Sequence, residues 1–583
     1  MTFADKRRCF ARRFSFAAAF IAVLLALGPA VRAQGPPPAD RLPADTIFYF
    51  TWRGLAPQSD AEKKNHLLQL WNDPDLAPLR LSASLGIQRA LTPKGQSSPP
   101  VVFGDLVSLL DNGSTLGFVL LPPPAKPSSA SPASRVALFT AYNTAGKAQL
   151  AQKVRDAIRA QSKGEPIVRT YDFGGTSVEV RTTSSGTSYS AQTGDYFLFS
   201  DKQEVVEELI ARFRAAEKPP SSVAQLADYQ KAKPYLDSGA LVKFFGHLPD
   251  LSQFVTPDED GKKLDALNRS LHLGKIHALA GSLSFDGEAT RYHAALLGDT
   301  SPGGIFDLWG PSAASFQMQP VVETAPLYSI ARLDLSAFYL WLRDAIGAVL
   351  PAQQAGGVMM FEGMAQSYLG MPVAEALALF TGELASLTTF SDDGAAQRTF
   401  AVAIQKPQDV LRLLRALLAS QIVAEDSSGG VTYLDLSFPY RDSATGQQRR
   451  TFYYVAVSPQ LAVIAQRKAT LRTAIERFNA KLPARAAAPD LARLRSRLPE
   501  KLSGLSEGDL TRVPWDNILA GLAAELKETA RESSKESQSN DQPAPDFGLA
   551  KTLKGDVITR HLHVAASGWW KDPNGVYFDS YLQ

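Results

Sequence analysis

Two histidines near the C-terminus have the spacing that comes closest to a metal site. His561 and His563 are two positions apart, so on a strand their side chains would share one face. Imidazoles in this arrangement can bind zinc, but a zinc site needs three or four ligands and the neighbouring residues supply no others. Leu562 and Val564 would form the apolar face of the same strand, which indicates that both histidines face solvent. We therefore expect no metal and no cofactor.

Short motifs for enzyme chemistry give little support to a catalytic function. The sequence has no phosphate-binding G-x-x-x-x-G-K-[ST], no dinucleotide-binding G-x-G-x-x-G and no zinc-binding H-E-x-x-H. We also expect no serine nucleophile at a G-x-S-x-G elbow. Catalytic residues can also be assembled from distant positions, as Ser, His and Asp are in hydrolases. We predict no catalytic residue, and a cofactor-independent hydrolase with a dispersed active site is the alternative function.

The most unusual local composition lies between residues 345 and 380. Four of the chain's six methionines fall here: Met359, Met360, Met364 and Met371. Methionine is flexible and polarizable, so an apolar surface rich in it can adapt to a hydrophobic ligand or partner. The predicted binding residues are Met359, Met360, Phe361 and Met364. The sequence favours another interpretation, a helical hairpin whose methionines are buried in the core, because most such apolar stripes are buried.

Aromatic residues flank the last predicted turn. Trp569 and Trp570 precede this turn, and Tyr577 and Phe578 follow it. Aromatic rings can stack on sugars, but adjacent residues on a strand point to opposite faces, so at most one of each pair could line a common surface. We expect cross-strand aromatic packing, with glycan binding as the alternative.

The elements that would position these residues recur in two halves of the chain. Two predicted helices end in Arg212-Phe213 and Arg477-Phe478, which are 265 residues apart. Another helix begins at Pro407, which suits a first helical turn because its missing N–H has no helical partner there. The predicted strands and helices match in order, 136–142 with 399–404, 146–158 with 407–418, 176–182 with 432–436, 187–192 with 452–457, and 196–200 with 461–465.

Each half also ends in a predicted β-hairpin. Asp286-Gly287 separates strands at 278–285 and 289–297, and Asn574-Gly575 separates strands at 557–570 and 576–582. Such dipeptides favour tight turns because these turns need a positive φ. We predict an α+β fold made of two copies of a mainly antiparallel sheet domain, each with helices packed on one face and closed by a β-hairpin. The copies would span 42–312 and 313–583, with a disordered polar insertion at about 527–547 in the second.

The first 33 residues have the pattern of a secretory signal peptide. Basic residues precede an apolar run at 14–27, and small residues lead up to a cleavage site between Ala33 and Gln34. This run of 14 residues is shorter than the roughly 20 that cross a bilayer as a helix. A Pro-rich lead-in at 34–41 follows. We therefore expect a periplasmic or secreted protein with no transmembrane segment in the mature chain.

The charge balance argues against a nucleic-acid partner. Without the first 33 residues, which hold six basic and one acidic residue, the remaining 550 residues have 55 basic against 57 acidic residues, a net charge of −2. A nucleic-acid groove needs a surplus of positive charge in the folded part. The single cysteine, Cys9, also lies in the predicted signal peptide, so we expect neither disulfides nor thiol chemistry in the mature protein.

Short segments give the chain a family resemblance. The start at Leu42-Pro43-Ala44-Asp45-Thr46, the stretch Arg332–Phe338 and the stretch Gly194–Leu198 are similar to those of an uncharacterised family of large secreted bacterial proteins. The resemblance spans most of the mature chain and implies no activity, cofactor or catalytic residue. The sequence therefore predicts an exported non-catalytic protein that binds an envelope partner or an apolar ligand.

Overall fold

The computed structural model describes most of the chain after the predicted signal peptide. The described residues are 37–54, 57–78, 80–81, 105, 108–109, 112–122, 135–160, 167–183, 186–247, 268–349, 352–380, 382–392, 394–441, 447–480, 488–520 and 554–583. The predicted cleavage site at Ala33 and Gln34 and the predicted insertion at 527–547 lie outside these residues.

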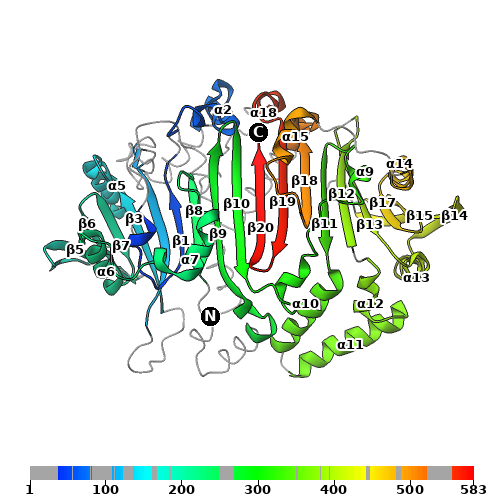
Figure 1. The fold of residues 1–583 in the computed structure, drawn as a ribbon, viewed down its shortest axis with the longest axis horizontal. Helices are drawn as coiled ribbons and strands as arrows, with labels where there is room; N and C mark the ends of the chain where they lie inside the picture. Colours follow the sequence, from blue (N-terminus) through cyan, green and yellow to red (C-terminus); the bar gives the residue numbers. More distant parts are fainter. Residues whose placement is uncertain are drawn as a thin grey trace. The chain divides into compact units, whose positions relative to one another are not determined.

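The fold is α+β, as predicted. Twenty strands form a large antiparallel sheet, and helices accompany the strands (Figure 1). The chain divides into two units, each built from separate stretches. Unit 1 comprises Met1–His247, Ser282–Thr290 and Trp515–His561, and unit 2 comprises Leu248–Gly281, Arg291–Pro514 and Leu562–Gln583. The predicted division into copies at 42–312 and 313–583 stays a prediction.

Unit 1 contains eight consecutive strands of the sheet, which pair in the order β4-β5-β6-β7-β3-β2-β1-β8. Every one of these pairings is antiparallel. The strands are β1 (Thr46–Trp52), β2 (Ser114–Leu120), β3 (Val136–Asn143), β4 (Ile167–Phe173), β5 (Thr176–Thr183), β6 (Gly186–Thr193), β7 (Tyr196–Ser200) and β8 (Val242–His247).

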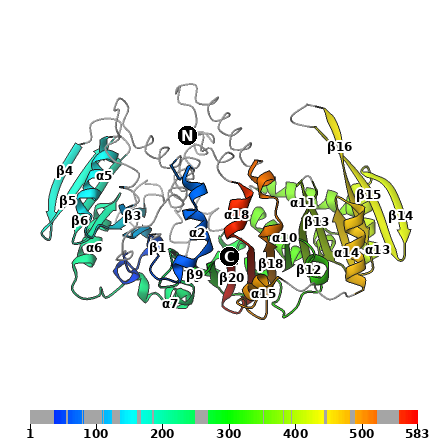
Figure 2. The same ribbon diagram turned by 90° about the horizontal axis from the view of Figure 1, so that it is seen from above.

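The longer helices of unit 1 lie on one side of its outer strands. Helices α5 and α6 are on the same side of β4–β6 (Figure 2). The Arg41 guanidinium donates hydrogen bonds to the carbonyls of Arg212 and Ala215, each at 2.8 Å, and so caps the C-terminus of α6. The end of the predicted lead-in is therefore part of the fold. The helices of unit 1 are α2 (His66–Asn72), α5 (Ala148–Ala160), α6 (Gln203–Arg214), α7 (Ala227–Ala232) and α18 (Gly555–His561).

Unit 2 contains ten strands that pair in the order β14-β15-β16-β17-β13-β12-β11-β18-β19-β20. Strand β20 also pairs with β10, which forms a hairpin with β9. The hairpin of β9 (Ile276–Asp286) and β10 (Ala289–Gly298) is divided, because its residues Ser282–Thr290 belong to unit 1. The ten strands of unit 2 are β11 (Leu327–Leu333), β12 (Gly382–Phe390), β13 (Ala396–Ala403), β14 (Ile422–Ser428), β15 (Val431–Arg441), β16 (Gln448–Val457), β17 (Leu461–Ala465), β18 (Gly504–Asp509), β19 (Val564–Asp572) and β20 (Gly575–Leu582).

A hydrophobic core in unit 2 joins helix α13 to the neighbouring strands. Val410 of the helix packs with Leu434 and Leu436 of β15, and all three are fully buried. Pro407 is at the first position of α13, as predicted. The helices of unit 2 are α9 (Gln319–Val322), α10 (Leu335–Val349), α11 (Ala352–Leu369), α12 (Val373–Ala378), α13 (Pro407–Leu418), α14 (Lys468–Asn479) and α15 (Pro489–Arg495).

The predicted strand at 557–570 is wrong in its first half. Residues Gly555–His561 form helix α18, and strand β19 begins only at Val564. The Asp516 carboxylate accepts a hydrogen bond of 2.7 Å from the Gly555 N–H at the helix start. The apolar residues Val557 and Ile558 are buried on this helix. Their β-branched side chains resemble a strand pattern, but packing and the polar contact at the first turn favour the helix.

No helix among the residues that the structure describes combines the length and the apolar character needed to span a membrane.

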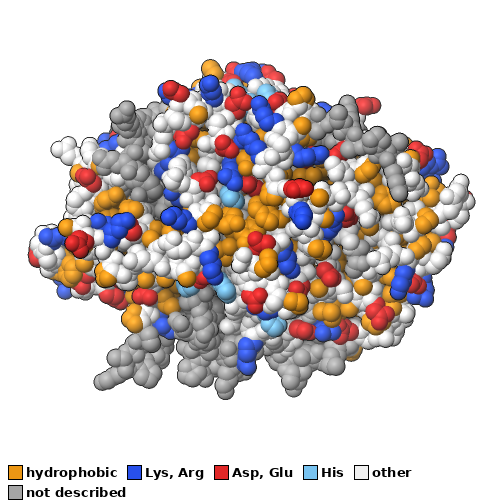
Figure 3. Space-filling view, viewed as in Figure 1, with side chains coloured by type: hydrophobic (Ala, Val, Ile, Leu, Met, Phe, Trp, Pro, Cys, Tyr) orange, Lys and Arg blue, Asp and Glu red, His pale blue; other side chains and the backbone are white. Residues whose placement is uncertain are grey.

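On the face drawn in Figure 3, Lys and Arg side chains are interspersed with Asp and Glu side chains.

We predict that Leu436→Ala lowers the free energy of unfolding by about 2–5 kcal/mol, because it leaves a cavity in the core of unit 2. Leu417→Ala is the matched control, since Leu417 is 48% exposed on α13. The control should change stability by less than about 0.5 kcal/mol. Urea unfolding of the purified chain measures both, and equal losses in the two variants would contradict the assigned core.

Candidate functional site

Five neighbouring strands of unit 2 carry serine at facing positions. Ser329 on β11 faces Ser386 on β12 and Ser506 on β18, Ser506 faces Ser567 on β19, and Ser567 faces Ser580 on β20. Facing residues of an antiparallel sheet lie on one face, and neighbouring strands are about 4.8 Å apart. This serine row therefore crosses about 19 Å of the sheet.

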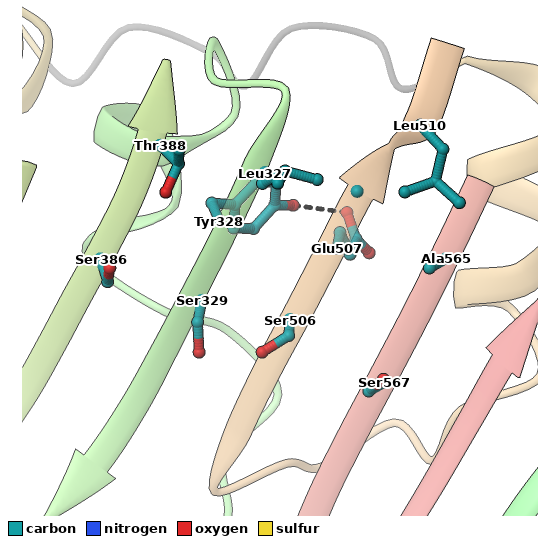
Figure 4. Close-up of a pocket in the computed structure, with 11 residues that line it drawn as sticks. Leu327, Tyr328, Ser329, Ser386, Thr388, Ser506, Glu507, Leu510, Ala565 and Ser567 are labelled. Atoms are coloured by element: carbon teal, nitrogen blue, oxygen red, sulfur yellow. Dashed lines mark hydrogen bonds between the residues drawn. The ribbon is translucent and has the colours of Figure 1, made fainter. Parts of the chain in front are cut away.

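Four members of the serine row lie in the floor of a cavity of about 310 Å³. Figure 4 shows Ser386, Ser329, Ser506 and Ser567 in a line across their strands. Leu327, Thr388, Leu510 and Ala565 line one side of the same cavity, and its lining also includes Gly508, Tyr328 and Glu507. We call this cavity the serine trough.

Two glycines lie on the face of β18 that carries the serine row, and one of them, Gly508, lines the trough. Gly504 and Gly508 precede and follow Ser506 by two residues, so they share its face of strand β18. A Cβ atom at Gly504 would lie 1.9 Å from the ring of Trp569, and one at Gly508 would lie 2.8 Å from Cδ2 of Leu327. The Trp569 ring and the Leu327 side chain thus pass over the glycines, and Ser506 lies between them.

The opposite face of the same strands carries a buried polar cluster. The Tyr328 hydroxyl donates to the carboxylate of Glu507, whose side chain is fully buried. The Arg495 guanidinium donates from Nε to Glu507 Oε1 and from Nη2 to Oε2, at 2.5 Å each, and from Nη2 to Glu323 Oε1 at 3.3 Å. This two-pronged contact holds helix α15 against strand β18.

The electrostatics of the cluster keep Tyr328 neutral and Arg495 charged. Burial, followed by the negative charge of Glu507, raises the pKa of Tyr328 well above its usual value. Burial opposes the charge of Arg495, but the hydrogen bond to Glu507 and the nearby acidic groups outweigh it and raise the Arg495 pKa. Glu323 and Glu507 share this one guanidinium, and Oε2 of Glu323 is buried with no hydrogen-bond partner among the described residues.

Ser506 was not among the residues predicted from the sequence, although a sequence signal surrounds it. Residues Gly504–Gly508 read G-x-S-x-G, the pattern that places a serine nucleophile at a sharp turn between a strand and a helix. Here the pattern lies inside the extended strand β18, which ends at Asp509. The trough lining in the described structure contains no histidine that could act as a base for Ser506. The glycines accommodate Trp569 and Leu327 instead.

The two C-terminal histidines do not share a strand face. His561 ends helix α18, where its Nε2 lies 2.7 Å from Oδ2 of Asp73. Arg560 donates to the same oxygen at 2.9 Å. The hydrogen bond from His561, followed by the backbone N–H of Asp75, lowers the pKa of Asp73. Among the described residues, no group of three or more His, Cys, Asp or Glu side chains is arranged to hold a metal ion.

The predicted methionine site lies on helix α11 of unit 2. Met360, Met364 and Tyr368 are four residues apart and are 66%, 65% and 61% exposed. We call these three residues the methionine stripe. The side chains of Met359 and Phe361 lie outside the described part of the structure. The alternative of buried core methionines is wrong for Met360 and Met364, whereas Met371 is buried in the core of unit 2.

The aromatic residues at the last hairpin pack across strands, as predicted. Trp570 faces Tyr577, and their rings are stacked with centroids 5.5 Å apart. Trp569 faces Phe578, on the side of the sheet that carries the serine row.

Comparison with models of known protein families, with curated proteins and with solved structures gives no match. The resemblance to a family of secreted proteins stays a prediction.

We predict that Glu507→Gln lowers the free energy of unfolding by about 3 kcal/mol, because it removes the charge that binds Arg495 through two hydrogen bonds and leaves it only the longer contact to a carboxylate, that of Glu323. This is the low end for a buried pair, since Arg495 keeps 30% of its side chain exposed. Glu425→Gln is the control, because Glu425 pairs with Arg415 at the surface. The control should cost no more than about 1 kcal/mol in the same urea titration. A cost for Glu507→Gln as small as that of the control would contradict the assignment of a buried pair.

The raised pKa of Tyr328 predicts a loss of stability at alkaline pH. Above about pH 10 the unfolded chain ionises this tyrosine while the folded chain keeps it neutral, so stability present below pH 10 is lost as the pH rises. In Tyr328→Phe, the fall in unfolding free energy between pH 9 and pH 11 should be smaller by up to about 1.4 kcal/mol. Denaturant titrations at the two pH values measure it, and an unchanged fall would contradict the prediction.

Proposed function

We propose that this chain is an exported, non-catalytic protein of the bacterial envelope that binds a partner protein through the methionine stripe. The observation that carries the proposal is the exposure of Met360, Met364 and Tyr368, each above 60%. On a helix, residues four apart share a face, so the stripe runs about 12 Å along one side of α11.

The rest of α11 explains why the stripe faces outward. Glu362 is the one charged residue in Ala352–Leu369. Its carboxylate accepts a hydrogen bond of 2.6 Å from the Tyr339 hydroxyl and lies 3.6 Å from Nη1 of Arg343, both on α10. Glu362 is two residues from Met360 and from Met364, so it lies on the opposite side of the helix. These contacts hold one side of α11 against α10 and leave the stripe on the other side.

The shape of the stripe favours a protein over an apolar small molecule. Small ligands bind in concave pockets that enclose most of their surface. An exposed helix side is convex, and a partner with an apolar groove can bury it. Methionine side chains adapt to the shape of such a groove. The partner would therefore be an envelope protein that presents a hydrophobic groove.

We also infer that the chain is an internal duplication. The strand order of unit 1, β4-β5-β6-β7-β3-β2-β1-β8, becomes that of unit 2, β14-β15-β16-β17-β13-β12-β11-β18, when ten is added to each strand number. Helices also follow matching strands, with α6 after β7 and α14 after β17. This agreement in pairing order supports two copies of one domain.

We predict that the double variant Met360→Ser/Met364→Ser loses its partner while it remains folded. Tagged full-length protein would be used to capture interacting proteins from the native envelope, and quantitative mass spectrometry would compare the variant with the parent chain. The protein specific to the parent should fall at least about tenfold, since two central apolar contacts are removed.

Leu417→Ser is the matched control, because Leu417 is a 48% exposed apolar residue on another helix of unit 2. The control should retain the partner. Equal capture by the parent chain and the double variant, with both folded by circular dichroism, would refute the stripe as the binding surface.

A further inference from the structure

The serine trough has the chemistry of a binding site for a neutral ligand. Its floor consists of the hydroxyls of Ser329, Ser386, Ser506 and Ser567, and Thr388 adds a fifth at the side. A hydroxyl both donates and accepts hydrogen bonds but carries no charge. The charged side chain of Glu507 turns to the other face, where Arg495 and Tyr328 bind it. Glu507 and Tyr328 also belong to the trough lining, but the Glu507 carboxylate is fully buried and already bound by Arg495 and Tyr328. The serine and threonine hydroxyls are therefore the polar groups left to bind a ligand.

Apolar surfaces border these hydroxyls. Leu327 and Leu510 line the trough on one side. On the other side of Ser506, the ring of Trp569 lies across Gly504 on the same face of the sheet. A sugar ring matches this combination of surfaces, because its hydroxyl groups form hydrogen bonds while its C–H faces pack on apolar and aromatic side chains.

Unit 1 shows that the strand arrangement does not itself require a trough. Its strands pair in the same order, but there Phe48 on β1 faces Phe118 on β2, with ring centroids 6.5 Å apart. Phe50 on β1 likewise faces Leu116 and Phe244. Large side chains fill this face in unit 1, whereas serines and glycines leave it open in unit 2. The trough thus results from the small side chains on this face of unit 2.

We propose that the serine trough binds an uncharged saccharide, with the serine row as the hydrogen-bonding floor. Trp569 is not part of the cavity lining, but it lies on the same face of the sheet two residues beyond Ser567, where its ring can contact a sugar that extends from the trough. The volume of about 310 Å³ is at the lower end of ligand sites, which range from about 300 to 1,000 Å³. It suits one or two sugar rings. This site uses strands β11, β12, β18 and β19, and the methionine stripe is on helix α11, so the two proposals are independent.

The test measures binding of glucose, N-acetylglucosamine, maltose and cellobiose to the full-length protein by isothermal titration calorimetry. At least one of these sugars should bind saturably. Ser506→Ala should weaken that binding about tenfold, because a sugar hydroxyl loses its partner in a partly buried site. Trp569→Leu should also weaken binding, whereas Ser427→Ala, on the exposed strand β14, should leave binding unchanged.

A second variant separates loss of the site from loss of the fold. Ser329→Phe places the residue type found at Phe48 of unit 1 into the trough and should abolish binding, with folding checked by circular dichroism. Met360→Ser/Met364→Ser should bind the sugar as the parent chain does. The proposal is overturned if no sugar of the panel binds, if glycerol phosphate binds more tightly than all of them, or if Ser427→Ala weakens binding as much as Ser506→Ala.

Discussion

The ion pair between Arg495 and Glu507 is the contact on which the arrangement of unit 2 depends most directly. It joins helix α15 to strand β18 through two hydrogen bonds, and Tyr328 of β11 adds a third to the same carboxylate. Side chains alternate along a strand, so a shift of one residue would exchange the two faces of β18. Glu507 would then enter the serine trough and Ser506 would face the helix. Because a buried carboxylate without partners is very unfavourable, the pair fixes the register that puts the serines in one row.

The two units carry different side chains on a half-buried face of their sheets. In unit 1, Phe48, Phe118 and Phe50 fill it with half-buried aromatic rings. In unit 2, serines occupy the facing positions, and Gly504 and Gly508 let neighbouring side chains lie flat against the strand. Serine buries less apolar surface than phenylalanine. This face therefore contributes less to the stability of unit 2 than the aromatic face contributes to the stability of unit 1. The buried core around Leu434 and Leu436 and the polar cluster at Glu507 supply stability from the other side.

Local patterns in the sequence identified much of the fold but not the trough. The strands Tyr196–Ser200 and Leu461–Ala465 and the helix Pro407–Leu418 have the predicted bounds, because each combines a clear apolar period with a turn or proline at its end. Strands β4 and β14 were not predicted, since most of their residues are exposed and show no apolar alternation. The serine row depends on the registers of five strands that are far apart in the chain, which no local pattern contains. The apolar composition of the Met-rich segment favoured burial in the core, whereas Met360 and Met364 are exposed on α11.

The positions of the charged side chains in unit 2 support the proposal of a binding protein. Acid–base catalysis needs titratable groups within hydrogen-bond reach of a substrate. In unit 2 the carboxylate of Glu507 is on the face of the sheet opposite the serine row, where it accepts hydrogen bonds from Arg495 and Tyr328. The polar groups of the serine row are neutral hydroxyls, and the side chains of the methionine stripe end in a phenol and two thioethers. Surfaces of this kind gain affinity from shape, hydrogen bonding and apolar contact. A concave polar surface and a convex apolar one also select different ligands, so a single chain can hold a saccharide and a protein at the same time without competition between them.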